Sequence, residues 1–122
     1  MGTGFAYLDA EKRSEIVELM DGDAEMVIEL IDTLLESAPG LMEELAAAVA
    51  ARHTEGVREA AHALKSSNAQ LGAVVFSGMC QQMENHGKNQ DADAAAGFLP
   101  GMQEEFARVQ EALNAWKQSL QA

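Results

Sequence analysis

The sequence predicts an all-α protein, a four-helix bundle of up-down-up-down topology with an additional short N-terminal helix. The chain has 22 Ala and 12 Leu against 7 Val, 3 Ile and 3 Thr. That balance favours helices over strands, because Ala and Leu lose little rotamer freedom in a helix. Apolar residues also recur at helical spacing along the chain. The length of 122 residues suits one domain with its own core.

Apolar spacing and stop signals define three segments in the N-terminal half. The first runs from about Asp9, a suitable N-cap, to Met20. Asp21-Gly22-Asp23 interrupts this segment and caps the second. The second has apolar positions at Met26, Val27, Leu30, Ile31 and Leu34. Pro39-Gly40 is expected to end the second segment and to start a third, whose inward residues are Leu41, Leu45 and Val49.

Three further segments follow in the C-terminal half. Thr54 is a natural N-cap for a helix that should reach about Gly72. The next helix carries Phe76, Met79, Cys80 and Met83 before Gly87 and Asn89 break it. The last has an a/d seam of apolar residues at Leu99, Met102, Phe106, Val109, Leu113, Trp116 and Leu120. Whether it begins near Asp91 and kinks at Pro100, or begins at Pro100, stays open.

Residues 1–8 are predicted to be a disordered N-terminal segment and residues 9–122 a single domain, because no repeat or low-complexity linker is present. The single cysteine, Cys80, excludes an internal disulfide, fits a reducing compartment and is expected in the core. No signal-peptide pattern is visible, and the longest apolar run, Leu45 to Ala51, is far shorter than the roughly 20 residues of a membrane span. We therefore expect a cytoplasmic protein.

The charge distribution restricts the partners. The formal net charge is −12, and residues 1–36 hold ten carboxylates against Lys12 and Arg13. Such an acidic chain repels phosphate backbones and anionic lipids, so neither nucleic acid nor membrane is an expected partner. Residues 66–83, in contrast, contain no formally charged side chain and directly follow Lys65. A partner is expected to dock on this neutral stretch.

The helix around residue 62 carries the strongest functional signal. On a helical wheel, His62 and Lys65 lie beside the buried seam, roughly 60° apart and within reach as an i,i+3 pair. Residues with little or no side chain follow on the same flank: Ala69, Gly72 and Ala73. A free imidazole has a pKa of about 6.5, so an exposed histidine beside a cation suits nucleophilic attack on a phosphoryl group.

The stretch Ala61 to Ala73 (Ala-His-Ala-Leu-Lys-Ser-Ser-Asn-Ala-Gln-Leu-Gly-Ala) closely resembles the signature of histidine-containing phosphotransfer (Hpt) domains of multistep phosphorelays. The resemblance includes the short N-terminal helix, Pro-Gly before the third helix, and the Met83-Glu84 pair. It implies that His62 is the phosphoacceptor, Lys65 its charge partner, and Gly72 the residue that leaves room for the phosphoryl group. This sequence departs from the pattern at Ser66, where Gly is commoner, and at Gln70, where Asn is commoner.

The resemblance also implies a function. Such domains accept a phosphoryl group from an aspartate on a receiver domain and pass it to another receiver, so the expected partners are receivers of response regulators or hybrid histidine kinases. The chain shows no glycine-rich phosphate loop or kinase signature, so no kinase activity and no cofactor are expected in it. The Mg ion belongs to the receiver. A monomer is expected, and the expected partner-binding residues are Arg58, Ser66, Ala69 and Ala73.

Three other functions have less support in the sequence. An adaptor that docks receivers without transfer would not need His62 and Lys65. An acyl carrier needs an Asp-Ser-Leu triplet, which the chain lacks, and an acidic inhibitor of a nucleic-acid enzyme is supported by charge alone. No metal site is expected from the three histidines, because no pair has i,i+3 or i,i+4 spacing. His53 and His86 are expected at the surface near helix ends.

Overall fold

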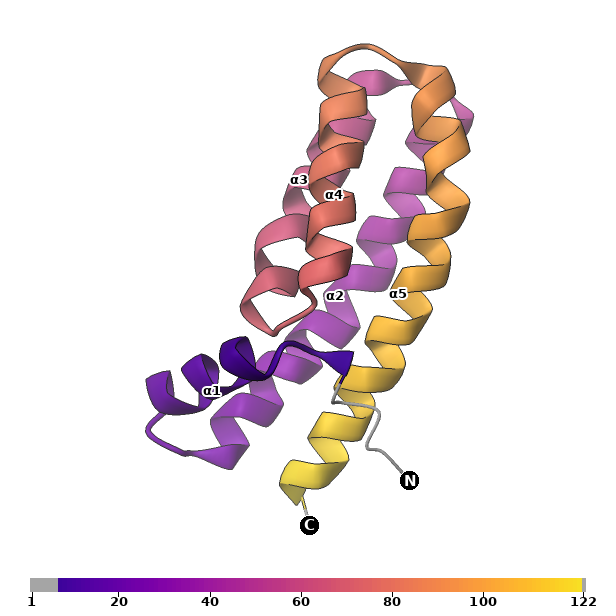
Figure 1. Cartoon of the computed structure of the whole chain (residues 1–122). Helices are drawn as coiled ribbons and strands as arrows, with labels where there is room; N and C mark the ends of the chain where they lie inside the picture. Colours follow the sequence, from indigo (N-terminus) through magenta and orange to yellow (C-terminus); the bar gives the residue numbers. More distant parts are fainter. Residues whose placement is uncertain (1–6, 122) are drawn as a thin grey trace.

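The computed structural model describes residues 7–121, which form five α-helices and no strand. The helices are α1 (Ala10–Leu19), α2 (Ala24–Ala50), α3 (Thr54–Gln70), α4 (Val74–Lys88) and α5 (Ala92–Gln121). Helices α2 to α5 run up and down in an antiparallel bundle, and α1 lies across one end against α2 and α3 (Figure 1). Helices α3 and α4 pack most extensively, and both α2 and α4 also contact α5. The predicted fold class is confirmed.

The four connections between helices end in the same backbone pattern. In each, an N–H just past the helix donates to a carbonyl five residues earlier: Gly22 to Val17, His53 to Ala48, Ala73 to Asn68, and Asp91 to His86. The residue before each of these donors has a positive φ, 53° at Asp21, 57° at Arg52, 94° at Gly72 and 56° at Gln90. This is the Schellman arrangement, which caps free carbonyls and reverses the chain within a few residues. The short turns hold neighbouring helices antiparallel.

The two prolines lie inside helices, and the prediction that Pro39-Gly40 ends a helix is wrong. Pro39 lacks the N–H that the carbonyl of Leu35 would accept, an interruption that costs about 3 kcal/mol in an isolated helix. Packing overrides this cost, because the helix buries apolar residues on both sides of the proline: Val27, Ile31, Leu34, Ala38, Met42 and Leu45. The start of the last helix, which the sequence left open, is also defined. Helix α5 starts at Ala92 and continues through Pro100.

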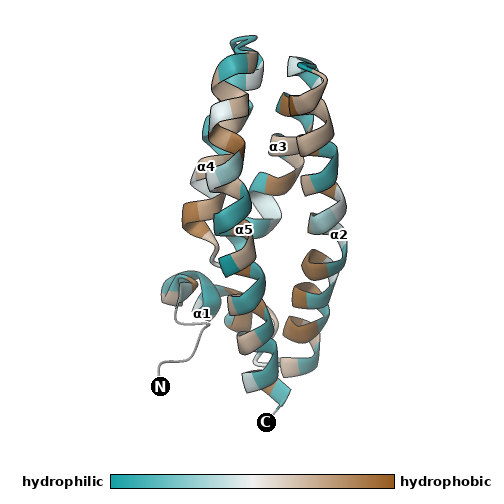
Figure 2. Cartoon of the chain, turned by 90° about the vertical axis from the view of Figure 1, so that its right-hand side faces the viewer, coloured by the Kyte–Doolittle hydropathy of each residue, from teal (hydrophilic) through white to brown (hydrophobic). Residues whose placement is uncertain are grey.

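The core lies between the four long helices. The predicted seam of α5 is confirmed, since Met102, Phe106, Val109, Leu113 and Trp116 are buried and the two end residues are partly buried. Figure 2 shows hydrophobic and hydrophilic positions alternating along each helix, as amphipathic helices require. Asn68 faces the core and donates from Nδ2 to the carbonyl of Leu64 at 2.8 Å. Cys80 is buried as predicted, and burial raises the pKa of its thiol to about 12.

Some predicted boundaries shift. Residues 1–6 of the segment predicted as disordered lie outside the described residues, but Leu8 is buried in the core and the Asp9 N–H donates to the Gly72 carbonyl at 2.9 Å. The packed domain therefore includes Leu8. The N-cap of α3 is His53, and Thr54 is its first residue. Within residues 7–121, no helix is long and apolar enough to cross a membrane.

Candidate functional site

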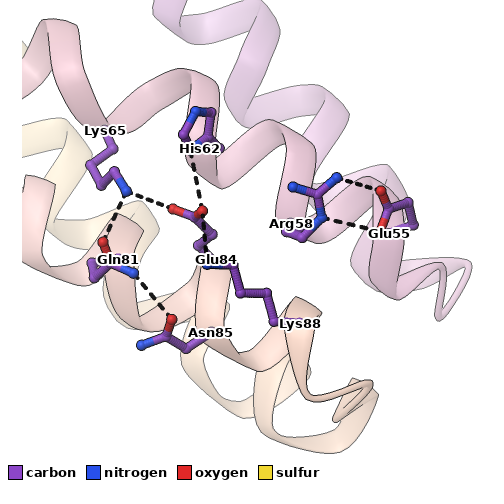
Figure 3. Close-up of polar contacts among 8 residues, drawn as sticks. All are labelled: Glu55, Arg58, His62, Lys65, Gln81, Glu84, Asn85 and Lys88. Atoms are coloured by element: carbon purple, nitrogen blue, oxygen red, sulfur yellow. Dashed lines mark hydrogen bonds and ion pairs between the residues drawn. The ribbon is translucent and has the colours of Figure 1, made fainter.

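His62 stands on the outer side of α3, next to the buried seam. Val57, Ala61, Leu64 and Asn68 face the core, and this leaves the His62 side chain 64% exposed. Its Nδ1 lies 3.2 Å from Oε2 of Glu84, which projects from α4 (Figure 3). The predicted position of the imidazole at the edge of the bundle is confirmed. One ring nitrogen faces the protein, and the ring is open to a partner.

Lys65 lies one turn after His62 and is held by α4. Its Nζ donates to Oε1 of Gln81 at 2.9 Å and to Oε1 of Glu84 at 2.8 Å. An ammonium group has three N–H donors, so α4 occupies two of them. The third is not used by α4, and the Lys65 side chain is 27% exposed.

Glu84 is the centre of this cluster. Its side chain is only 5% exposed, and it contacts Lys65, His62 and Lys88, the last at 3.6 Å. The hydrogen bond from Lys65 holds the pKa of Glu84 below its ordinary value of 4.5, against the effect of burial, and His62 adds to this lowering. The carboxylate is therefore ionised at neutral pH and acts only as an acceptor.

The ionised Glu84 selects the tautomer of His62. Because a carboxylate cannot donate, the 3.2 Å contact requires the proton on Nδ1 of the imidazole. The lone pair then resides on Nε2, the other ring nitrogen. An exposed ring with a free Nε2, a carboxylate behind it and an ammonium beside it is equipped for nucleophilic attack on an electrophilic phosphorus.

Gly87 sets the spacing between the two helices that build the site. A Cβ at this position would lie 2.7 Å from the backbone N of Arg58 and 2.8 Å from the carbonyl O of Thr54. The glycine thus allows close backbone contact one turn away from both His62 and Glu84. In antiparallel helices, the pairing of Gly87 with Arg58 places Glu84 opposite His62. Gly87 lies within α4 and does not break the helix as predicted, whereas Asn89 is the C-cap that ends it, as predicted.

Comparisons with known proteins identify the family of the chain. The family model described as "Hpt domain" matches residues 29–118. The chain belongs to the Hpt domain family. It is 33% identical over 109 residues to the sensor protein TorS of Escherichia coli K12, covering 89% of this chain and 11% of that protein. It is 23% identical over 104 residues to the phosphorelay intermediate protein rdeA of Dictyostelium discoideum, covering 85% of this chain and 41% of that protein.

A solved structure supports the same assignment of fold. The crystal structure of histidine-containing phosphotransfer protein B from Pseudomonas aeruginosa PAO1 matches with a TM-score of 0.84 and 25% sequence identity. The match covers 93% of this chain and 96% of that chain. The Hpt bundle is therefore shared over nearly the whole length of both.

Two of the small residues that were predicted to lie on the same flank as His62 in this Hpt chain are not on that surface. Ala73 is buried at the N-cap of α4, so the prediction that it contacts a partner is wrong. Gly72 is also buried, in the turn after α3, and a Cβ there would lie 3.2 Å from the backbone of Asp9. It is ten residues beyond His62, about 15 Å along a helix. Its φ of 94° and the close approach of the Asp9 backbone explain why this position is a glycine. The prediction that Gly72 leaves room for the phosphoryl group at His62 is corrected accordingly.

The other flank residues of the Hpt chain are at the surface. Ser66 is exposed and Ala69 is partly exposed, one and two turns after His62. They line a groove of about 380 Å³ together with Lys12, Glu15, Ile16, Leu19 and Gln70. Arg58 is partly exposed, but its guanidinium is paired with Glu55 on its own helix.

Sequence reasoning noted Glu84 as part of the Hpt resemblance but gave it no role. A signal was present, because Glu84 is the one formally charged residue between Lys65 and Lys88. It also shares helical spacing with Cys80 and Gly87, which are buried. A carboxylate on a buried face needs a cationic partner. Within residues 7–121, the structure brings no three His, Cys, Asp or Glu side chains together as a metal site.

Replacing Glu84 with Gln is expected to lower stability in a pH-dependent way. At about pH 7 the loss of the charged acceptor of Lys65 should cost about 1–2 kcal/mol of unfolding free energy. Because the pKa of Glu84 is lower in the folded chain, its stabilising effect is present above the ordinary value of 4.5 and is lost as the pH falls through the folded value. Urea unfolding across this range should show the difference from wild type shrinking toward acid. A constant difference would contradict this linkage, and Glu111→Gln on the exposed side of α5 controls for net charge.

Proposed function

We propose that this chain is a phosphorelay intermediate in two-component signalling. It accepts a phosphoryl group on His62 from a receiver-domain aspartate and transfers it to another receiver. The observation that carries the proposal is the exposed imidazole of His62, oriented at Nδ1 by the buried Glu84 and flanked by Lys65. Membership of the Hpt family and the likeness to rdeA, a phosphorelay intermediate by name, support it.

The transfer step balances without loss of a proton. Nε2 of His62 attacks phosphorus, the Nε2–P bond forms, and the P–O bond to the receiver aspartate breaks. The electron pair of that bond stays on the aspartate oxygen. The imidazole keeps its Nδ1 proton and becomes positive, and the carboxylate of Glu84 stabilises this charge. The reverse sequence delivers the group to the next receiver.

The remaining electrostatic work is divided between the two partners. The free N–H of Lys65 offsets charge on the phosphoryl oxygens as they approach His62. The Mg ion expected at the phosphorylated aspartate belongs to the receiver, not to this chain. The chain acts as a phosphotransfer module without kinase activity of its own, and receivers of response regulators or hybrid histidine kinases are its partners.

The receiver docks over the groove between α1 and α3. Ser66 and Ala69 continue the face of α3 that carries His62, and their small side chains leave the groove open. Leu19, on the opposite wall, is 68% exposed. An exposed leucine on the wall of this groove is a suitable contact for an apolar patch on a receiver.

Replacing Leu19 with Glu is expected to slow phosphoryl transfer from a receiver about tenfold while leaving stability unchanged. A charged group in the interface would have to be desolvated, and about 1.4 kcal/mol of lost binding corresponds to a factor of ten. Transfer rates can be followed by intact mass against time. Gln103→Glu adds the same charge on the exposed surface of α5 and should transfer at the wild-type rate. Equal transfer rates for Leu19→Glu and Gln103→Glu would show that the groove is not part of the docking surface.

The proposed function is tested by incubating the chain with a phosphorylated receiver and then with a second, unphosphorylated one. The first step should add one phosphoryl group that is lost on acid treatment, and the second should move it to the new receiver. Binding to several receivers without any mass increase would instead support the adaptor function.

A further inference from the structure

Lys88 is the second cation at the Glu84 carboxylate. It is the last residue of α4, four residues after Glu84, in the order that favours a Glu–Lys pair on a helix. Its Nζ lies 3.6 Å from Oε2 of Glu84, the same oxygen that His62 Nδ1 contacts at 3.2 Å. Lys65 instead binds Oε1. In Figure 3 Lys65, His62 and Lys88 approach Glu84 from three different sides.

Within the described part of the chain, Lys65 and Lys88 are the only lysine or arginine residues that contact Glu84. Arg58, one turn before His62 on α3, has its guanidinium paired with Glu55 and interacts with Glu84 electrostatically at longer range, without a contact. Glu59 also lies on α3 near His62 and is exposed, and it adds negative charge. On the other side of His62, the Nζ of Lys65 binds Gln81 and Glu84. Lys88 is therefore placed to balance the carboxylates around the imidazole.

The net charge around the imidazole depends on Lys88. Before transfer, the ionised Glu84 and the two lysines leave one net positive charge around a neutral imidazole. A phosphoryl group brings about two negative charges, and the ring gains one positive charge because it keeps its Nδ1 proton. Counted over Glu84, Lys65, the ring and the phosphoryl group, the net charge is then zero with Lys88 and one negative charge without it, and the exposed Glu59 adds negative charge in both cases.

We propose that Lys88 is a positioning residue of the phosphoryl site that acts through Glu84. It neutralises the carboxylate, so that Glu84 holds the Nδ1 proton without repelling the incoming phosphoryl oxygens. The inference rests on the proposed function of His62 as a phosphoacceptor. Because Lys88 is 54% exposed, its electrostatic effect on the labelling rate is screened by salt.

The test uses phosphoramidate, a small phosphoryl donor that needs no receiver. Nε2 of His62 attacks its phosphorus, the donor P–N bond breaks, and ammonia leaves. At low salt, Lys88→Gln should be labelled about three- to tenfold more slowly than wild type, the order expected when one charge near a doubly charged group in water is removed. The deficit should shrink at about 1 M salt, where the Debye length is about 3 Å.

Two matched variants complete the design. Lys88→Arg keeps the charge and should restore labelling. Lys117→Gln removes a lysine that pairs with Asp32 between α5 and α2, and it should be labelled like wild type. The inference is overturned if Lys88→Gln is labelled at the wild-type rate at low salt, or if its deficit does not change with salt.

The same experiment separates this inference from the proposed function. A chain that phosphoramidate labels, but that exchanges nothing with receivers, would contradict the relay function while the comparison of Lys88→Gln with wild type still decides the role of Lys88. A wild-type chain that neither phosphoramidate nor a phosphorylated receiver labels at His62 would overturn both.

Discussion

Replacing His62 with Gln is expected to abolish phosphorylation by a phosphorylated receiver and to leave helical content and stability close to wild type. The amide of Gln has no nucleophilic nitrogen lone pair, so no N–P bond can form. Its NH₂ group can still donate to Glu84, so the buried carboxylate keeps a partner. Because the His62 side chain is mostly exposed, little packing is lost.

The measurement is intact mass after incubation with the phosphorylated receiver, together with circular dichroism and urea unfolding. His53→Gln is the matched control, because His53 is an exposed histidine at the start of the same helix, nine residues before His62. It should be labelled like wild type. If His62→Gln gains an acid-labile phosphoryl group, the acceptor is another residue and the mechanism proposed for Glu84 does not apply.

Replacing Gly87 with Ala is expected to destabilise the bundle by about 2–3 kcal/mol and to slow phosphotransfer as well. The new Cβ would lie 2.7 Å from the backbone N of Arg58 and 2.8 Å from the carbonyl O of Thr54, so α4 and α3 must move apart. The added methyl group would press against backbone atoms, which cannot rotate away as a side chain can. The loss of stability should therefore lie at the upper end of the range for small-to-large substitutions. The shift would also draw Glu84 away from His62, since each lies one turn from the point of contact.

Gly78→Ala on the same helix is the matched control. A Cβ at Gly78 meets no atom within 4 Å, so the substitution should stabilise α4 by about 0.5–1 kcal/mol through its helix propensity. Urea unfolding of both variants and their rates of labelling by phosphoramidate provide the comparison. A Gly87→Ala chain as stable and as reactive as wild type would show that the close helix contact does not position the site.

Much of the fold and the centre of the site could be predicted from the sequence, for local reasons. His62 and Lys65 are three residues apart on one helix, and helical geometry alone places them together beside the buried seam. The a/d seam of α5 likewise depends only on spacing within one element. Such features need no knowledge of the neighbouring helices.

The prediction at Pro39 was wrong because local and tertiary effects oppose each other there. A proline interrupts the hydrogen bonding of an isolated helix, but residues on both sides of Pro39 are buried against the bundle. Pro100 posed the same problem in α5, and the local pattern could not decide between two starting points. In both helices, the burial of apolar surface along the whole length outweighs the hydrogen bond that the proline removes.

The sequence by itself therefore determined the helical class and the placing of the proposed phosphoacceptor His62 beside Lys65, both of which depend on spacing within single helices. Only the tertiary structure decided what Glu84, Gly87 and Gly72 do. Glu84 orients His62 across two helices, Gly87 admits the backbone of α3, and Gly72 admits the backbone of Asp9. Each of these roles is defined by atoms distant in the chain, whose positions follow from how the helices pack.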